Sequence, residues 1–343
     1  MKKNKIKIGV IGSGAVGTII ATKLSSYNYD VEYVYDRQTD IEIGNMKDLN
    51  VLGETTPCST LIKCINNTKD FTSKKDIIFL MCKSTHINLH IEAIKNNLSS
   101  NGFVVMLNNT LVRKLVTKHI PKSKIVGMFI DWSCEKLNDN TAIVTKAGST
   151  MLGVYSLDAM PLAKLVYNIL VPICKPVLLE NFSDYVLGRV ILNSTLACLG
   201  ALCGQKLGDY LKNKYAKRLF VELIREGYCV YRSIGITPTD YDGKLDYSLF
   251  VQRNKLAEKY QKQIMKLLIK QNPNTRSSIL KDLEQNKTIE LDYLLGTIIE
   301  TGRKNGIIIE YSEKVYKKII EIKSNNDTIR EDLLEIVYKG STK

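Results

Sequence analysis

The first half of the chain alternates short apolar runs with segments of helical periodicity. Five of these runs are candidate strands, namely Ile6–Ile11, Val31–Tyr35, Ile77–Cys82, Phe103–Leu107 and Ile125–Ile130. Several of them are apolar at consecutive positions, which indicates strands buried on both faces, as in a parallel sheet covered by helices on both sides. β-Favouring runs continue through Thr141–Tyr155, and Pro172 and Pro176 punctuate the stretch that follows.

From Ser183 onward the periodicity becomes helical. The widest apolar stripe has the spacing i, i+3, i+4, i+7, i+8 and consists of Leu291, Leu294, Leu295, Ile298 and Ile299. Asn272–Asn274 separates this stripe from a helix predicted around Ser248–Gln271. We therefore predict a doubly wound α/β domain over residues 1–178 and an all-α domain over residues 179–343. The site residues described below indicate that the first domain binds the cofactor and that the second binds the substrate and carries the catalytic residues.

A glycine-rich loop follows the first candidate strand directly and opens a helix. Its GxGxxG spacing is formed by Gly12, Ser13, Gly14, Ala15, Val16 and Gly17. In dinucleotide-binding domains these glycines permit a tight turn, a close approach of the pyrophosphate and close packing of helix on strand. The N–H groups at the start of such a helix face the phosphates. In this context the loop predicts a Rossmann-type dinucleotide site rather than a turn without a ligand.

The second candidate strand ends at Tyr35 and is followed by Asp36 and Arg37. An acid about 20 residues after the loop is placed to bind the adenosine ribose hydroxyls. Asp36 favours NADH, because a carboxylate repels a 2′-phosphate, whereas Arg37 could accept that phosphate. Both cofactors therefore remain open. Lys83 and Asn109 follow two further strands, where ligands of open α/β sheets bind.

The composition and net charge limit the kinds of molecule that the chain is expected to bind. The chain has 44% hydrophobic and 24% charged residues, as soluble globular proteins do, and a formal net charge of +14. Its lysines are spread along the whole chain without interleaved aromatics, so we expect a small anionic ligand rather than nucleic acid. The helical half could also offer a face for a homodimer.

We predict a cytoplasmic protein that binds no metal. Met1–Lys5 imitates the start of a signal peptide, but glycines and a helical pattern follow at once, so we expect folded protein there. No continuous apolar segment approaches the ~18 residues of a membrane span. The eight cysteines form no CxxC pair, which suits the reducing cytoplasm. His86 and His90 have a one-face spacing without a third ligand, so we predict no metal.

Four polar residues of the second half are candidates for a site. Arg189 and Asn193 are i and i+4 on one helix face, where polar groups must reach a cleft or a hydrogen-bond partner. Ser278 could bind a ligand or simply cap a helix. Glu290 borders the apolar stripe, and its alternative role is a surface carboxylate.

With these residues in place, the chain resembles the ketopantoate reductase family over essentially its full length. The glycine loop reads GSGAVG, the strand-end lysine is Lys83 in FLMCKS, and the LQNG turn of the family appears as Leu107–Thr110. The C-terminal S-x11-E-x-D-Y pattern is the most specific part and appears as Ser278, Glu290, Asp292 and Tyr293.

The resemblance implies an activity and a role for each matching residue. The family reduces the 2-keto group of ketopantoate to D-pantoate, usually with NADPH, on the way to pantothenate and coenzyme A. Asn109 and Lys83 would contact the nicotinamide end of the cofactor and the substrate side of the cleft. Asn193 would reach the substrate, Ser278 its carboxylate, and Glu290 its hydroxyl or the ribose.

Three departures from the family pattern affect the chemistry. Arg189 stands where the family has its catalytic lysine, and because an arginine keeps its proton at ordinary pH it is a poor proton donor. It could still polarise the ketone, with water, Lys206 or another group giving the proton. Ala197 replaces a second helix asparagine, and Thr110 replaces the glycine of LQNG. Two alternatives follow: a D-2-hydroxyacid dehydrogenase for another branched or aromatic 2-oxoacid, and an NAD(P)-binding paralogue with impaired catalysis.

Overall fold

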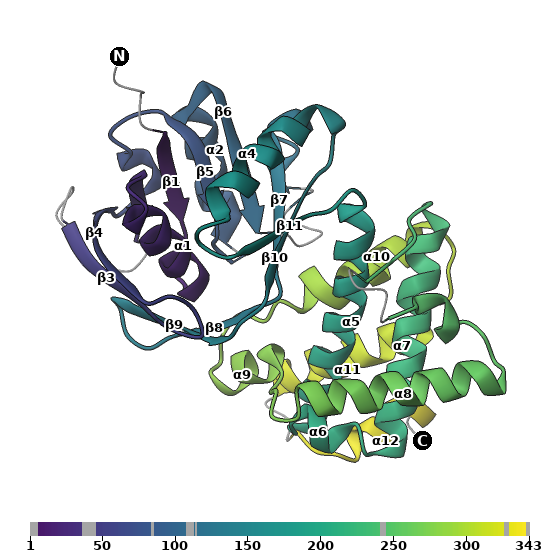
Figure 1. Cartoon of the computed structure of the whole chain (residues 1–343). Coiled ribbons are helices and arrows are strands. Elements are labelled where there is room, and N and C mark those ends of the chain that lie inside the picture. Colours follow the sequence, from purple (N-terminus) through teal and green to yellow (C-terminus); the bar gives the residue numbers. More distant parts are fainter. Residues whose placement is uncertain are drawn as a thin grey trace. The chain divides into compact units, whose positions relative to one another are not determined.

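The computed structural model describes residues 6–35, 46–83, 86–107, 113, 115–240, 245–325 and 329–340. Two compact units divide the chain, Met1–Ser183 and Asp184–Lys343 (Figure 1). The first unit contains a mostly parallel sheet with helices, and the second is helical among its described residues. The predicted fold class, a Rossmann-type α/β domain followed by an all-α domain, is confirmed. The division falls a few residues after the boundary predicted between 178 and 179.

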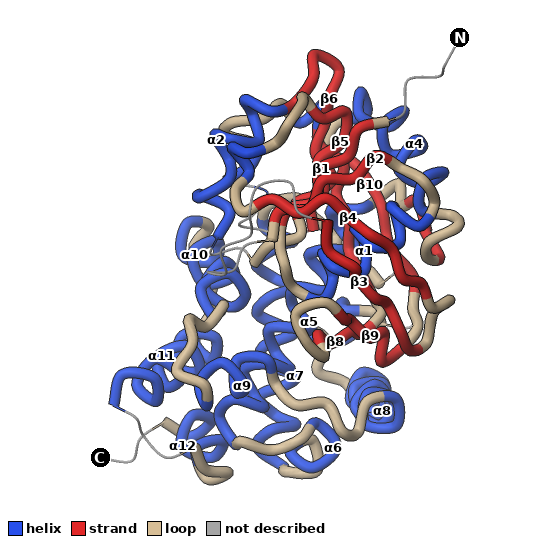
Figure 2. The backbone as a smooth tube through the Cα atoms, turned by 90° about the vertical axis from the view of Figure 1, so that its left-hand side faces the viewer, coloured by secondary structure: helices blue, strands red, loops and turns tan. Residues whose placement is uncertain are grey.

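Eleven strands of the described residues form one sheet in the first unit, coloured red in Figure 2. They are β1 (Lys7–Ile11), β2 (Asp30–Val34), β3 (Met46–Gly53), β4 (Cys58–Ile65), β5 (Lys75–Leu80), β6 (Leu98–Leu107), β7 (Ile125–Ile130), β8 (Ser133–Lys136), β9 (Thr141–Lys146), β10 (Ser149–Val154) and β11 (Lys175–Leu178). Their order is β11-β10-β7-β6-β5-β1-β2-β4-β3-β9-β8. The central strands from β7 to β4 are parallel, while β3, β8 and β10 run antiparallel to β4, β9 and β7.

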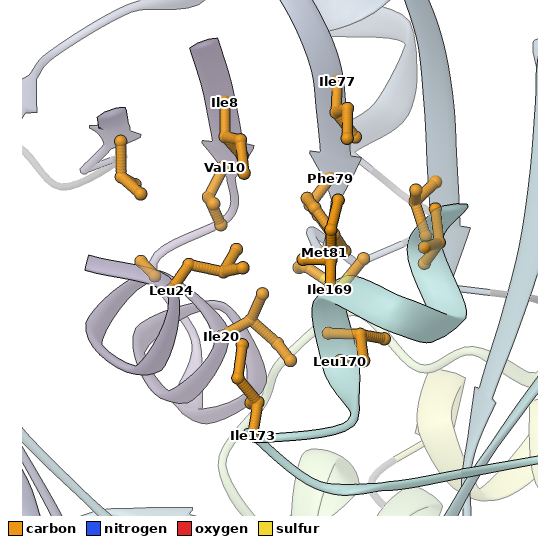
Figure 3. Close-up of a cluster of buried hydrophobic side chains, with 14 of the residues drawn as sticks. Ile8, Val10, Ile20, Leu24, Ile77, Phe79, Met81, Ile169, Leu170 and Ile173 are labelled. Atoms are coloured by element: carbon orange, nitrogen blue, oxygen red, sulfur yellow. The ribbon is translucent and has the colours of Figure 1, made fainter. Parts of the chain in front are cut away.

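Strands β1, β5, β6 and β7 are buried on both faces over their apolar runs, as the consecutive apolar residues predict. Alternate residues of β1 and β5 face α1 (Ala15–Ser26) and α4 (Met160–Leu170), and Figure 3 shows this side of the sheet. The residues between them face α2 (Ile87–Asn97) on the other side. Because these strands are parallel and helices cover both faces of the sheet, the carboxyl ends of β1, β2 and β5 lie at one edge of the sheet, where the glycine loop lies.

Strands β3 and β8 were not predicted, because their burial follows no strong apolar pattern. β3 has only two buried residues, and β8 reads SCEK with none. Together with β9 they extend the sheet past β4 and bring Val51, Trp132 and Val144 against Ile19 of α1. The sheet therefore curls around the flank of α1, as β3, β8 and β9 do in Figure 1.

A buried ion-pair network holds β2 to the neighbouring strands. The carboxylate of Glu32 lies 2.8 Å from Lys63 Nζ and 2.5 Å from Lys75 Nζ, and it accepts hydrogen bonds from the backbone N–H and the hydroxyl of Thr72. Glu32 and Lys75 are both buried. Burial alone would raise the pKa of Glu32, but the hydrogen bonds from Lys63, Lys75 and Thr72 outweigh it and hold the pKa at about 2.

This network predicts acid-sensitive stability. A carboxyl whose pKa falls from 4.5 to about 2 on folding stabilises the protein above pH 4.5, and the contribution is lost as the pH falls towards 2. Between pH 7 and pH 3 we expect the wild type to lose about 2 kcal/mol more free energy of unfolding than Glu32→Gln. Urea titrations at both pH values measure this, with the exposed Glu135→Gln as control. Equal losses in wild type and Glu32→Gln would contradict the assignment.

The second unit is built around two long helices, α5 (Phe182–Cys203) and α7 (Lys214–Ser233). The others are α6 (Leu207–Tyr210), α8 (Lys255–Gln271), α9 (Ser278–Glu284), α10 (Thr297–Lys304), α11 (Glu310–Asn325) and α12 (Leu333–Lys339). Gly227 of α7 lets the two long helices approach closely, because a Cβ there would lie 2.9 Å from Cγ1 of Ile191. The helix predicted around Ser248–Gln271 begins later, at Lys255, where the Asn254 side chain caps it.

Helix α5 is long and apolar enough to cross a membrane by those two criteria alone. Its most apolar stretch has a mean hydropathy of 1.7, and 78% of that stretch is buried inside the protein. Such burial is typical of the core helix of a globular unit, because a membrane span would present its apolar surface to lipid.

Candidate functional site

The turn between β1 and α1 requires two of its three glycines for space. Gly12 has a φ of +116°, and a Cβ there would lie 2.5 Å from the backbone nitrogen of Cys82. A Cβ on Gly17 would lie 1.8 Å from the carbonyl oxygen of Gly12. The turn is thus closed on itself and pressed against the end of β5, as the sequence pattern predicts for a phosphate-binding loop.

Gly14 is different, because the position that a Cβ would occupy on it is open. It is the N-cap residue of α1, with an extended backbone, and a Cβ there would have nothing within 4 Å. The first turn of α1 carries no acidic side chain. The first N–H groups of a helix lack intrahelical acceptors and lie at the positive end of its dipole. Residues 12–17 therefore fit a pyrophosphate, with open space where it would approach most closely.

Lys83 lies at the same edge of the sheet. The backbone N–H of Met81 donates to the carbonyl of Ile11 at 2.7 Å, so the ends of β1 and β5 remain paired up to the glycine loop. Lys83 comes two residues later and is exposed. Of the other predicted cofactor residues, Asp36, Arg37 and Asn109 lie outside the described residues, as does Thr110, so their roles stay predictions.

Two lysines at this edge were not singled out from the sequence. Lys136 of β8 donates a hydrogen bond from Nζ to the carbonyl oxygen of Ser13, at 2.7 Å, inside the glycine loop. Lys47 of β3 lies with Nζ 4.0 Å from the ring centre of Tyr35, the residue that follows β2. Both come from strands that the curled sheet brings back to the loop, so no local sequence signal marks them.

In the helical unit, Arg189 and Asn193 lie one turn apart on α5. Arg189 is half-buried and Asn193 is exposed. Burial raises the pKa of the Tyr247 hydroxyl, and the positive charge of Arg189 acts in the opposite direction. The Tyr247 hydroxyl donates to the carbonyl of Gly188 at 2.6 Å, so it also anchors the turn of α5 that carries Arg189.

The start of α9 lies against the same helix one turn beyond Asn193. The Ser277 hydroxyl donates to the carbonyl of Ala197 at 2.6 Å and accepts from the N–H of Leu280 at 3.1 Å. Ser277 is thus the cap of α9, and Ser278, which the sequence left as either ligand or cap, is an exposed first-turn residue beside α5. Sequence reasoning missed Ser277, because adjacent serines give equal capping signals.

Glu290 precedes a π-helical turn, η6 (Asp292–Gly296), which interrupts the predicted helix. Its carbonyl accepts from the N–H groups of both Tyr293 and Leu294, at 3.2 Å each. Glu290 is half-buried, and the Asp292 carboxylate accepts a hydrogen bond from the Tyr316 hydroxyl. π-Turns are rare and occur frequently at functional sites. The extra residue in this turn changes which side chains share the face next to Glu290.

The remaining candidates have ordinary surroundings. His90 is buried, with Nδ1 2.8 Å from the Thr68 hydroxyl, whereas His86 is exposed at the start of α2. The part of the chain that the structure describes contains no cluster of three or more metal-ligating side chains. Lys206, the alternative proton donor, is exposed at the N-cap of α6.

Two family models match the chain, one on each unit. The model described as Ketopantoate reductase PanE/ApbA matches residues 8–156, and its C-terminal counterpart matches residues 181–323. The chain belongs to the ketopantoate reductase family. This membership identifies it as an NAD(P)H-dependent oxidoreductase of the 2-dehydropantoate 2-reductase type.

Individual members of the family are similar in sequence to this chain over most of its length. It is similar to the 2-dehydropantoate 2-reductase of Pyrococcus horikoshii, with 25% identity over 87% of this chain and 91% of that protein. The enzyme of the same name from Aquifex aeolicus is 22% identical, over 92% of this chain and 96% of that one.

Solved structures share the fold at lower sequence identity. A PanE/ApbA family ketopantoate reductase from Ralstonia eutropha has a TM-score of 0.77 at 17% identity, covering 93% of this chain and 99% of its own. A D-mandelate dehydrogenase in complex with NADH and anilino(oxo)acetate has a TM-score of 0.76 at 17% identity, covering 96% and 100%. The predicted family is therefore confirmed, and the substrate within it is a separate question.

Proposed function

We propose that this protein reduces the 2-keto group of ketopantoate to D-pantoate with NADPH. The observation that carries the proposal is the match of the two ketopantoate reductase models, one to each unit, together with a glycine loop whose geometry suits a pyrophosphate. Residues 12–17 would hold the pyrophosphate of a reduced nicotinamide dinucleotide, which when bound would supply the hydride for the 2-keto carbon. A proton must also reach the ketone oxygen to complete the alcohol.

Each site residue has a role in this proposal. The Arg189 guanidinium stabilises negative charge as it develops on the ketone oxygen, and because it stays protonated, water supplies the proton. Asn193 and Glu290 orient the substrate by hydrogen bonds. Ser278 donates to the carboxylate of the 2-oxoacid. Lys83, together with the predicted Asn109, contacts the nicotinamide side of the cofactor.

The alternative is a D-2-hydroxyacid dehydrogenase that acts on another branched or aromatic 2-oxoacid. The fold shared with D-mandelate dehydrogenase and the small side chain of Ala197 beside Asn193 both support it. Either activity suits a soluble cytoplasmic enzyme, and a homodimer is a further proposal, supported by a family relative described as a dimeric ketopantoate reductase.

Oxidation of the reduced cofactor, followed at 340 nm, separates the two activities. The purified full chain is given ketopantoate, 2-ketoisovalerate or phenylglyoxylate, each with NADPH and with NADH. The proposal predicts the highest kcat/KM for ketopantoate with NADPH. A clear preference for phenylglyoxylate would establish the dehydrogenase instead. Cofactor binding without turnover of any oxoacid would indicate the impaired paralogue.

A further inference from the structure

Two lysine ammonium groups converge on the carboxyl end of β2. Lys136 Nζ lies 5.0 Å from the ring centre of Tyr35, and Lys47 Nζ lies 4.0 Å from the same centre. Tyr35 itself is buried and follows β2 directly, and its hydroxyl donates to the main-chain carbonyl of Asp139. Both positive charges therefore lie near one ring, although they belong to different strands, β3 and β8.

The charges of the same two lysines also act on the thiol of Cys64. Cys64 pairs with Tyr33 in the register of β4 on β2 and is fully buried. Burial raises the pKa of its thiol to about 11, while the charges of both Lys47 and Lys136 act in the opposite direction. Both ammonium groups thus act on one small region at the end of β2, in addition to the bond from Lys136 to the glycine loop.

This region is where the adenosine ribose lies in doubly wound dinucleotide-binding domains, between the loop after the first strand and the end of the second. NADPH differs from NADH only by a phosphate on the 2′-hydroxyl of that ribose. A phosphate ester carries up to two negative charges near pH 7, and paired ammonium groups stabilise it by charge-assisted hydrogen bonds.

We propose that Lys47 and Lys136 form the subsite for the 2′-phosphate and make the protein select NADPH over NADH. The inference rests on the proposed function, because it assumes that the glycine loop holds a nicotinamide dinucleotide. The sequence alone leaves the choice open, since Asp36 favours NADH and Arg37 favours NADPH. Lys47 and Lys136 come from strands that are distant in sequence but lie near the end of β2 in the curled sheet. Their two positive charges favour NADPH, which carries the 2′-phosphate.

The competing role for both lysines is structural, as cations packed on Tyr35 and, for Lys136, as a support for the glycine loop. That role makes a different prediction. A support for the loop or for the ring contributes equally to NAD⁺ and NADP⁺ affinity, whereas a phosphate subsite contributes to NADP⁺ alone. The ratio of the two dissociation constants therefore distinguishes the roles without any measurement of activity.

The experiment is isothermal titration of the full chain with NADP⁺ and with NAD⁺. It compares wild type, the double variant Lys47→Gln/Lys136→Gln, and a control double variant, Lys118→Gln/Lys122→Gln. The control removes the same charge from exposed lysines in the segment leading to the amino end of β7. We expect wild type to bind NADP⁺ more tightly than NAD⁺. In Lys47→Gln/Lys136→Gln the Kd for NADP⁺ should rise about 30-fold or more, and the Kd for NAD⁺ should change by less than about 3-fold.

Each other outcome overturns a specific statement. If the double variant loses both nucleotides equally, or keeps the wild-type ratio, Lys47 and Lys136 are structural and the subsite proposal is wrong. If the control variant shows the same change in the ratio of the NADP⁺ and NAD⁺ dissociation constants, the cause is the loss of positive charge in general. That result would also overturn the subsite proposal. If wild type binds neither nucleotide, the proposed function itself fails, which is a separate result from a wrong subsite.

Discussion

Replacing Arg189 by alanine is expected to lower kcat by about 100- to 1,000-fold while the Kd for NADP⁺ stays within about 3-fold of wild type. The guanidinium is the fixed positive charge that the proposal places at the ketone oxygen, where negative charge develops as hydride arrives. The cofactor contacts proposed in the first unit do not include Arg189. Steady-state assays with saturating ketopantoate and titrations with NADP⁺ measure the two quantities.

The conservative variant Arg189→Lys tests how the charge acts. Lysine keeps a positive charge but loses it at high pH, whereas arginine does not. We therefore expect Arg189→Lys to retain more activity than Arg189→Ala and to show a new fall in kcat on the alkaline side of its pH profile. Wild-type kinetics in Arg189→Ala would remove Arg189 from the site and direct attention to Lys206 as the cationic group.

A methyl group on Gly14 is expected to weaken NADP⁺ binding at least about 10-fold without unfolding the protein. A Cβ at Gly14 meets no protein atom within 4 Å, and alanine at an N-cap costs about 1 kcal/mol or less relative to glycine. The methyl group would instead occupy the space through which the pyrophosphate approaches the loop. Titration with NADP⁺ and the midpoint of thermal unfolding measure the two effects separately.

Gly17→Ala is the matched contrast in the same loop. Its Cβ would lie 1.8 Å from the Gly12 carbonyl oxygen, so the loop must shift, and we expect a loss of about 1–3 kcal/mol in the free energy of unfolding. Gly14→Ala should therefore change binding with little change in stability, and Gly17→Ala should change both. If Gly14→Ala binds NADP⁺ as tightly as wild type, the loop does not hold the pyrophosphate.

The core of the first unit could be predicted from sequence, because its signals are local. Strands β1, β5, β6 and β7 each contain a run of consecutive apolar residues, and β2 has apolar residues on both sides of Glu32. Each of the five was predicted to within a few residues at its carboxyl end. The glycine loop was equally predictable, since its spacing encodes the turn. Strand β6 begins earlier than predicted, at Leu98, because Lys75 pairs with Leu98 across an irregularity in the register.

The features that were missed depend on contacts between distant residues. Ser277 bonds to Ala197, 80 residues away, and Lys136 bonds to Ser13, 123 residues away. Neither pairing leaves a periodic trace in the sequence. The π-turn after Glu290 was also hidden, because the stripe from Leu291 to Ile299 has the spacing of a regular helix.

The central claim is hydride transfer from a nicotinamide to the carbon of a 2-keto group. Its most direct measurement uses ketopantoate and NADPH labelled with deuterium at C4, prepared separately in the R and S forms, followed by mass spectrometry of the product. The account predicts that one of the two forms gives pantoate with a single deuterium on its C2 carbon. Unlabelled pantoate from both forms, or no pantoate from either, would contradict it.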